Sequence, residues 1–233
     1  MEKPTLYLIP CRIAEGNPDR FFSDLWKLDI RHLRHFLAED VRTARQFLSS
    51  LKVFGDIGTL AFSVLSRETP VGSVEELMQP LKDGHDLGVL SESGCPGIAD
   101  PGAMAVAWAH RKGFQVRPLV GPSSIVLALM ASGFNGQQFT FNGYLPIGQQ
   151  ELTGTIRKLE RQSRETGAAQ LFIESPHRNQ RLLEVLLKTL SPATRLCVAL
   201  DLTGSGERII SQPVLAWPAV DLPKLPCIFL FQA

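Results

Sequence analysis

The sequence lacks several features that would assign it to a familiar functional class. Its four cysteines form no CxxC pair and no zinc-type spacing, and His32 and His35, three residues apart, have no third ligand near them. No GxGxxG, P-loop, GxSxG or HExxH motif occurs, so nothing favours a dinucleotide-binding, Walker-type, serine-hydrolase or zincin protein. Widely spaced cysteines are typical of a reducing compartment. We therefore expect a cytoplasmic protein with no bound metal.

Long apolar runs and an excess of one charge are also absent. The longest apolar run, residues 125–131, is far shorter than a membrane span, and the N-terminal apolar run is too short for a signal peptide. There are 24 Lys and Arg residues against 23 Asp and Glu, which leaves a formal charge of +1. Such a chain lacks the electrostatic footprint of a general nucleic-acid or membrane-surface binder. We expect no membrane partner, and any anionic partner must be held locally.

The composition and the apolar pattern predict two α/β domains. At about 150 residues per domain, a chain of 233 residues corresponds to about one and a half domains. Its apolar content of 44% is enough to bury a sizeable core without a metal or a disulfide. Short apolar runs bounded by Gly or Pro alternate with segments of helical period, as in sheets with crossover helices. The division is expected near residue 120, giving domains over 1–120 and 121–233.

Strands and helices are expected to alternate through both domains. The predicted strands cover residues 5–10, 33–38, 60–65, 87–90 and 115–119, then 139–143, 170–173, 196–200, 208–214 and 228–231. The predicted helices cover residues 20–28, 41–51, 74–82 and 103–112, then 124–132, 152–165 and 180–190. From residue 196 onward strands follow one another without a helix between them. That spacing favours mixed or antiparallel pairing in the second domain.

The loop over residues 91–102, SESGCPGIADPG, is the most informative segment. It has twelve residues, where an ordinary strand-to-helix connection needs about two to six. It follows a predicted strand, and open α/β sheets bind ligands at the carboxyl ends of their strands. Its glycines would let a ligand approach backbone N–H groups closely. The alternative interpretation is a connector held rigid by its prolines.

A second loop, VGPSS over residues 120–124, also leads from a predicted strand into a helix. Ser123 or Ser124 is well placed to cap that helix, which alone would explain a serine there. The same hydroxyl and the free amides beside it can also contact an anion or a ribose. The spacing leaves both interpretations open.

Charged side chains cluster at two further junctions between a strand and a helix. Glu174, His177 and Arg178 can act as a base, a proton carrier and an anion clamp. Alternatively, a helix begins there and these charges are solvated. At the other junction stand Glu39 and Asp40, where the helix dipole favours acids in any case.

Six segments together resemble the tetrapyrrole methylase superfamily. In order they are LYLIP, LAEDVRTARQFL, SESGCPGIADPG, PLVGPSSIVLALMASG, FNGYLP and FIESPHR. The resemblance extends from about residue 5 to the C-terminus and is closest to the methyltransferase I branch, which methylates a ribose 2′-oxygen of small-subunit ribosomal RNA. It implies a homodimer of two-domain α/β chains that binds S-adenosylmethionine in a cofactor cleft between the two domains.

The resemblance also implies which residues hold the cofactor. They belong to the three loops that stand out on physical grounds: the long loop of the first domain, the segment between the domains and the junction after the strand at 170–173. The implied cofactor-binding residues are Ser93, Gly94, Cys95 and Ile98, then Ser123 and Ser124, and finally Glu174.

The catalytic group, if one exists, is not identified by the sequence. Methyl transfer from a sulfonium is an in-line displacement, so the protein mainly has to align the nucleophile, the methyl group and the sulfur. A ribose hydroxyl is nevertheless a poor nucleophile that benefits from a nearby base. The acidic candidates at predicted loop ends are Glu39, Asp40, Glu92, Glu174 and Asp201.

The chain departs from the methyltransferase I pattern at three places, which keeps two alternatives open. The branch reads SDAGTP where this chain has SESGCP, and of its TPIGN segment only Gly16 and Asn17 align. Its RELTK becomes LDLTG over residues 200–204, which lacks the arginine and the lysine. The missing cations favour a methyl acceptor that is tetrapyrrole-like or another small molecule. The divergent loops favour a non-catalytic protein that binds S-adenosylmethionine. The main interpretation is a methyltransferase of ribosomal RNA that acts on the small ribosomal subunit.

Overall fold

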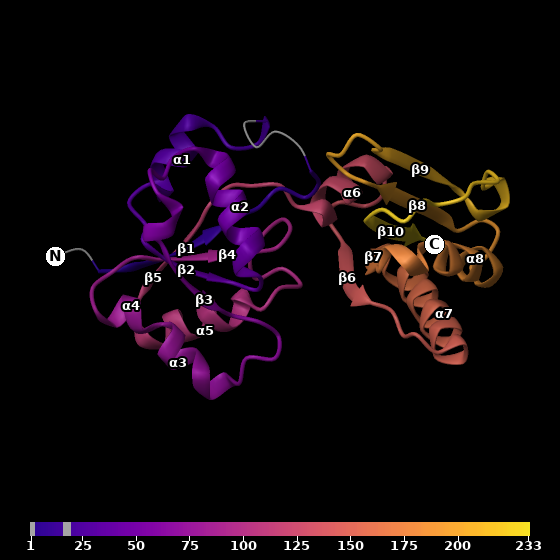
Figure 1. The fold of residues 1–233 in the computed structure, drawn as a ribbon. Coiled ribbons are helices and arrows are strands. Elements are labelled where there is room, and N and C mark those ends of the chain that lie inside the picture. The colour runs from indigo at the N-terminus through magenta and orange to yellow at the C-terminus, as the bar shows by residue number, and fades with distance from the viewer. Residues whose placement is uncertain (1–2, 16–19) are drawn as a thin grey trace. The chain divides into compact units, whose positions relative to one another are not determined.

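The computed structural model describes residues 3–15 and 20–233, and the chain forms two compact units (Figure 1). The units are Met1–Ser123 and Ser124–Ala233, so they divide three residues beyond the expected boundary. Gly16 and Asn17, the residues aligned with TPIGN, lie outside the described residues. None of the helices in the described ranges is long and apolar enough to cross a membrane.

The first unit is built on a five-stranded parallel sheet in the order β3-β2-β4-β1-β5. Its strands are β1 (Thr5–Ile9), β2 (His35–Ala38), β3 (Ala61–Val64), β4 (Leu87–Leu90) and β5 (Gln115–Pro118). Its α-helices are α1 (Asp24–Ile30), α2 (Val41–Leu51), α3 (Val74–Leu77), α4 (Gln79–Lys82) and α5 (Gly102–Lys112). All five strands expected in this half are present.

Two helices of this unit differ from the expected ranges for local reasons. The predicted helix over residues 74–82 is divided at Met78 into α3 and α4. Pro80 has no N–H to donate and disfavours helical geometry in the residue before it, so one continuous helix cannot form. Helix α1 begins at Asp24 rather than near residue 20, because the Ser23 side chain accepts the N–H of Trp26 and caps the helix there.

Helices cover both faces of the first sheet. Helices α1 and α2 pack against Ile9 and Phe36 on one face, and α3, α4 and α5 pack against Leu6 and Leu37 on the other. The chain therefore leaves β1 toward one face and β4 toward the opposite face, although these two strands are neighbours. Their loops diverge at the carboxyl ends, which is the topological switch point where open α/β sheets bind ligands.

The second unit contains a mixed five-stranded sheet in the order β6-β7-β10-β8-β9. Its strands are β6 (Phe139–Tyr144), β7 (Ala169–Glu174), β8 (Arg195–Leu200), β9 (Arg208–Pro213) and β10 (Cys227–Gln232). Its α-helices are α6 (Ser124–Ser132), α7 (Gln149–Thr166) and α8 (Asn179–Thr189). Only β6 and β7 pair in parallel, and the other pairs are antiparallel. The mixed pairing expected from residue 196 onward is confirmed.

Alternating side chains on the central strands fill two cores in this unit. Phe172 of β7 and Phe229 of β10 stack at 5.9 Å on the face covered by α7 and α8. Leu171 and Leu230, their chain neighbours, point to the face covered by α6. Both strands are buried on both faces. The carboxyl end of β7 therefore lies at a fixed position beside the amino end of β10, at one end of the sheet.

Candidate functional site

Three loops of the first unit meet at the carboxyl ends of β4, β1 and β5. Cys11, just after β1, donates its N–H to the carbonyl oxygen of Gly94 over 2.8 Å. The thiol of Cys95 lies 3.4 Å from the carbonyl oxygen of Pro122, which follows β5. Gly121 packs so closely that a Cβ there would overlap the Pro10 ring. The long loop and the segment before Ser123 are therefore in direct contact.

The long loop has a constrained backbone. Gly94 and Gly97 have φ angles of +74° and +82°, a backbone conformation that residues other than glycine rarely adopt. Ala99 also lies in the left-handed region, with φ of +58°, and its carbonyl accepts a hydrogen bond from Arg67 over 2.8 Å. Strained residues of this kind persist where surrounding contacts hold them, and such positions cluster at ligand sites.

Asp100 organises the end of this loop, and reasoning from the sequence missed it. Its Oδ1 accepts the N–H groups of Gly97 over 2.9 Å and of Gly102 over 2.6 Å. Its Oδ2 is buried and has no hydrogen-bond partner among the described residues. A buried carboxylate oxygen without a partner is costly, so this atom is suited to accept a donor from a ligand. An aspartate two residues before a helix is the signal that would have identified it.

Carboxylates gather around Asp100. Burial raises the pKa of Glu39, which follows β2, and the nearby negative charges of Asp100 and Glu92 raise it further, while Arg67 opposes them. Glu39 and Glu92 also line one small cavity beside Cys11. Glu39 therefore lies within electrostatic reach of two other acids, and this concentration of negative charge favours a ligand that carries positive charge.

Asp40, next to Glu39, has a different role. Its carboxylate accepts the N–H of Thr43 over 2.6 Å and caps α2. This hydrogen bond lowers the pKa of Asp40. The capping role alone is enough to account for an acid at this position.

The other predicted residues of this region have more varied surroundings. The Ser93 hydroxyl donates to the carbonyl of Ile13 over 3.4 Å, and the Ser93 carbonyl accepts the hydroxyl of Ser91 over 3.0 Å. Ile98 is 53% exposed, an unusual position for an isoleucine in a constrained loop. Ser123 ends the first unit and Ser124 begins α6 in the second.

The cysteines and histidines of the described residues lie mostly apart from one another or are buried. All four cysteines are free thiols, and burial raises the pKa of Cys95 and of Cys11, so both stay protonated near neutral pH. His32 contacts Asp86 over 2.9 Å. Across residues 3–15 and 20–233, no three His, Cys, Asp or Glu side chains come together as metal ligands.

In the second unit, Glu174 and Asp201 lie at the same end of the sheet, at the carboxyl ends of β7 and β8. Cys227, at the start of β10, pairs with Glu174 on one side and with Leu200 on the other. Because β10 lies between β7 and β8, the two acids stand about two strand spacings apart, or about 10 Å. The sequence separates them by 27 positions.

Both oxygens of the Glu174 carboxylate have partners within the second unit. Its side chain is 2% exposed and forms an ion pair with Arg178 over 2.6 Å. Its Oε1 also accepts the N–H of Ser175 over 2.7 Å. A helical turn, Pro176–Arg178, begins immediately afterwards, and His177 is exposed. A helix start therefore accounts for this junction, and Arg178 is paired with an acid.

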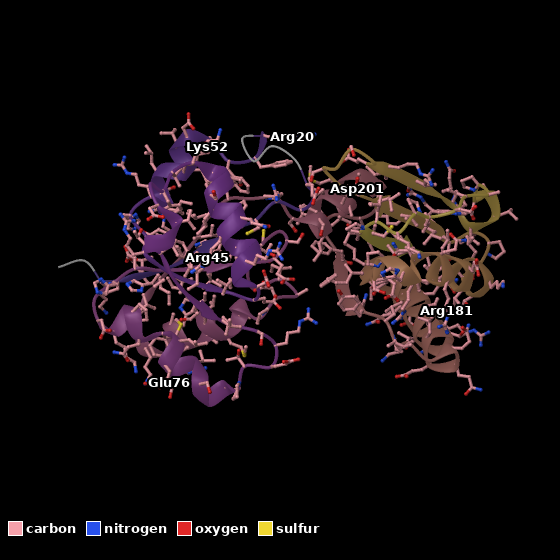
Figure 2. All side chains as sticks on the ribbon, in the orientation of Figure 1. Arg20, Arg45, Lys52, Glu76, Arg181 and Asp201 are labelled. Carbon is pink, nitrogen blue, oxygen red and sulfur yellow. The ribbon has the colours of Figure 1, made fainter. Side chains whose placement is uncertain are left out.

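Asp201 (labelled in Figure 2) holds a tight turn after β8. Its φ is +46°, and its Oδ2 accepts the N–H of Gly206 over 2.8 Å. A Cβ on Gly204 would overlap this carboxylate, so the turn requires a glycine there. Asp201 and Gly204 thus work as a pair in this turn, where RELTK would stand in the methyltransferase I branch.

The chain is similar in sequence to curated proteins named ribosomal RNA small subunit methyltransferase I. It is 30% identical to that of Vibrio cholerae over 224 residues, which cover 94% of this chain and 73% of the relative. It is 32% identical to that of Halalkalibacterium halodurans over 214 residues, covering 90% and 68%. For Escherichia coli O157:H7 the values are 31% over 150 residues, covering 63% and 51%. No protein-family model matches the chain.

Solved structures of methyltransferases share the fold. The methyltransferase CobJ superimposes with a TM-score of 0.63 at 16% identity, covering 100% of this chain and 95% of that one. Diphthine synthase gives a TM-score of 0.67 at 13% identity, covering 98% and 90%. Uroporphyrin-III-C-methyltransferase from Thermus thermophilus gives 0.55 at 16%, covering 98% and 94%. The fold class expected from the sequence is confirmed.

Proposed function

Because the chain belongs to the ribosomal RNA small subunit methyltransferase I family, within the tetrapyrrole methylase superfamily, we propose that it methylates a ribose 2′-oxygen of small-subunit ribosomal RNA. The methyl donor in this proposal is S-adenosylmethionine, which supplies a methyl group activated on a sulfonium. The names of the relatives support the RNA substrate, and the shared fold supports the methyltransferase class.

The carboxyl edge of the first unit suits this donor. S-adenosylmethionine carries a sulfonium and an ammonium against one carboxylate, so it is a net cation when both ends are ionised. Glu92 and Asp100 both act electrostatically on Glu39, and the buried Oδ2 of Asp100 has no partner among the described residues. That unpartnered oxygen at the switch point is the observation that carries the assignment. Gly94 allows a ligand to approach the loop backbone.

We assign Ser93, Gly94, Cys95 and Ile98 of the long loop to cofactor binding, together with Ser123, Ser124 and Glu174 from the two later loops. The close contact between the long loop and Pro122 supports the first two groups. Because Arg178 and Ser175 occupy the carboxylate of Glu174, any ligand contact at that residue is expected through its main chain.

Glu39 is the strongest candidate for the base that receives the ribose hydroxyl proton. Asp40 caps a helix, Asp201 holds a turn and Glu174 is paired with Arg178. Of the five acidic candidates from the sequence, Glu39 and Glu92 therefore remain. The raised pKa of Glu39 makes its carboxylate a stronger proton acceptor than an ordinary glutamate. No covalent step is required of it.

Replacing Glu39 by glutamine is expected to lower kcat by about a hundredfold or more, because a positioned base contributes about 10²–10⁴ to the rate. In the wild type, kcat/KM should fall as the pH drops through the raised pKa of Glu39, since protonation removes the base. This fall at low pH is the acid limb of the profile, and Glu39→Gln should not show it. The measurement is a pH–rate profile between about pH 5 and about pH 9.

Asp40→Asn is the matched control for this profile, because asparagine caps helices as well as aspartate does. It should keep both the stability of α2 and the acid limb. If Glu39→Gln retains the limb at a normal rate, Glu39 is not the base.

The proposed function is tested with purified protein, labelled S-adenosylmethionine and small ribosomal subunits from a strain that lacks the gene. We expect label in the RNA and, by primer extension, a stop at one 2′-O-methylated ribose that the deletion strain lacks. If the RNA gains no label and the deletion strain has lost no ribose methylation, ribosomal RNA is not the substrate.

The turn around Asp201 gives a reason to test a second acceptor class. Residues 200–204 lack the cations of the RELTK segment, and a carboxylate holds the turn instead. If the protein methylates a small molecule instead, it should show no affinity for ribosomal RNA, or an affinity that salt does not change. A protein that binds the cofactor without catalysis should transfer label to no cellular fraction.

The same proposal includes a homodimer located in the cytoplasm, as the family resemblance implies. Four cysteines that remain free thiols are compatible with a reducing compartment.

A further inference from the structure

Arg67 lies in the turn that follows β3, and its side chain reaches across to the long loop. Its Nη2 donates to the carbonyl oxygen of Ala99, 32 positions away in the chain, over 2.8 Å. Ala99 has a φ of +58°, a conformation that a residue other than glycine keeps where other contacts hold it. Asp100 is next in the chain, and its Oδ2 is the buried oxygen without a partner among the described residues. The guanidinium therefore steadies the residue beside the one that is suited to a ligand.

The turn that carries Arg67 is held by its own hydrogen bonds. The N–H of Ser66 donates to the hydroxyl of Thr69 over 2.9 Å, and the N–H of Thr69 donates to the carbonyl of Ser66 over 3.1 Å. The N–H of Glu68 donates to the Ser66 hydroxyl over 3.2 Å. Leu65, just before the turn, is buried. The backbone of Arg67 is thus fixed relative to the sheet, while its side chain is exposed.

The sheet places this turn beside Glu39. Strands β2 and β3 pair in parallel with Ala38 opposite Val64, and the N–H of Leu65 donates to the carbonyl oxygen of Ala38 over 2.9 Å. Glu39 follows Ala38 directly, and Arg67 comes two residues after Leu65. Both side chains therefore start from the same end of two neighbouring strands.

Arg67 supplies positive charge at a place where the other influences disfavour a carboxylate. Burial and the negative charges of Asp100 and Glu92 raise the pKa of Glu39, and among the described residues Arg67 is the charge that lowers it. The arginine therefore helps to keep Glu39 available as a proton acceptor.

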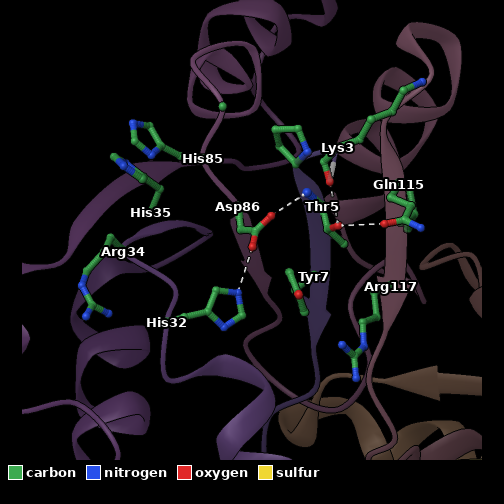
Figure 3. Close-up of a pocket in the computed structure, with 13 residues that line it drawn as sticks. Lys3, Thr5, Tyr7, His32, Arg34, His35, His85, Asp86, Gln115 and Arg117 are labelled. Carbon is green, nitrogen blue, oxygen red and sulfur yellow. Dashed lines mark hydrogen bonds and ion pairs between the residues drawn. The ribbon is translucent and has the colours of Figure 1, made fainter. Parts of the chain in front are cut away.

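A group of histidines in the same unit lies too far away to share this effect. His32, His35 and His85 line a pocket of about 580 Å³ at the amino ends of the strands (Figure 3). Strand β2 begins at His35 and ends just before Glu39, so a strand length of about 13 Å separates these two residues. That distance exceeds the Debye length of about 8 Å at physiological ionic strength. The titration of these histidines should therefore leave Glu39 unaffected.

We propose that Arg67 is a positioning residue of the methyl-transfer site, which fastens the turn after β3 to the long loop at Ala99 and keeps a positive charge near Glu39. The inference rests on the proposed function, in which the long loop binds the cofactor and Glu39 receives the proton. One side chain then links the two parts of the site, because its hydrogen bond acts on the loop and its charge acts on the base.

The first test measures the pKa of Glu39 by NMR titration of the glutamate side-chain carboxyl carbons, in the full chain and without substrate. The signal of Glu39 is the one that is missing from Glu39→Gln. Arg67→Met removes the charge and the donor but keeps much of the aliphatic stem. The pKa of Glu39 should rise by about half a unit, the effect of losing one charge several ångströms away in water.

Arg67→Lys and Arg42→Met are the matched controls for this titration. Lysine keeps the positive charge, so the pKa of Glu39 should stay near its wild-type value. Arg42 is exposed, follows Glu39 by three positions and acts on Asp40 rather than on Glu39. Its removal should not move the pKa of Glu39. A purely structural role of Arg67 would not separate lysine from methionine in this way.

The second test is titration calorimetry with S-adenosylmethionine. Arg67→Met should weaken binding by about tenfold, because the loop loses a charged hydrogen bond and has to be ordered when the cofactor binds. In the methyl-transfer assay, the acid limb of Arg67→Met should move to higher pH by as much as the pKa of Glu39 rises. If Arg67→Met fails to fold, Arg67→Gln replaces it in both tests.

The proposal requires both effects of the substitution. If either the pKa of Glu39 or the cofactor affinity is unchanged in Arg67→Met, Arg67 does not position the site. A raised pKa of Glu39 and weakened binding with an unmoved acid limb support the role of Arg67 and show instead that Glu39 is not the base. If the wild type binds no cofactor, the proposed function fails, and the NMR titration alone decides whether Arg67 sets the charge at Glu39.

Discussion

Replacing Gly94 by valine is expected to abolish measurable S-adenosylmethionine binding, a loss of at least about a hundredfold in titration calorimetry. The φ of Gly94 is +74°, where a β-branched residue costs about 1–3 kcal/mol. A Cβ at this position would lie 3.4 Å from the carbonyl oxygen of Pro122, and the two methyl groups beyond it would enter the space between the loops. Methyl transfer should be lost with binding.

Gly113→Val is the control that separates the backbone strain caused by valine from the steric obstruction of the cofactor site. Gly113 ends α5 with a φ of +73°, almost the same as that of Gly94, but a Cβ at Gly113 would meet no atom within 4 Å. Both variants should lose a similar part of the free energy of unfolding. Only Gly94→Val should lose affinity for the cofactor. If it binds normally, the loop is the proline-held connector that the sequence also allowed.

The position of this loop followed from its length and composition, while its internal organisation did not. Twelve residues with three glycines after a buried strand predicted a ligand loop, and the chain does place it at the switch point of the sheet. The role of Asp100 depends on where Gly97 and Gly102 lie in space, which no spacing rule specifies. Its unpartnered oxygen is visible only after folding.

Adjacent acids show the same limit of sequence reasoning. Glu39 and Asp40 are neighbours at one junction, and both were reasonable candidates for a base. The backbone directs Asp40 onto the N–H of Thr43 and leaves Glu39 facing Asp100 and Glu92. One side chain caps a helix and the other lies among carboxylates, a distinction that requires the path of the chain.

Long-range pairing hid one further feature. The sequence predicted mixed pairing after residue 196, yet the position of β10 between β7 and β8, which brings Glu174 and Asp201 to the same end of the sheet, could not be read from it.

Replacing Arg178 by methionine is expected to lower the free energy of unfolding by about 3 kcal/mol, measured by urea denaturation. The Glu174 side chain is 2% exposed, and Arg178 is its charged partner at 2.6 Å. Methionine keeps much of the aliphatic stem but removes the cation, so a buried carboxylate is left with the N–H of Ser175. Removing one member of a buried ion pair costs about 3–5 kcal/mol, and the lower end applies because Arg178 is partly exposed.

Two further variants decide whether Arg178 serves the fold or a ligand. Arg181→Met, on the exposed face of α8 (Figure 2), removes a cation whose contacts are with Ile147 and Gln149, and should cost less than about 1 kcal/mol. Combining Glu174→Gln with Arg178→Met removes the buried charge and should recover most of the lost stability. A stability loss with unchanged cofactor affinity assigns the pair to folding, whereas normal stability with weakened binding of cofactor or RNA would restore the anion clamp predicted from the sequence.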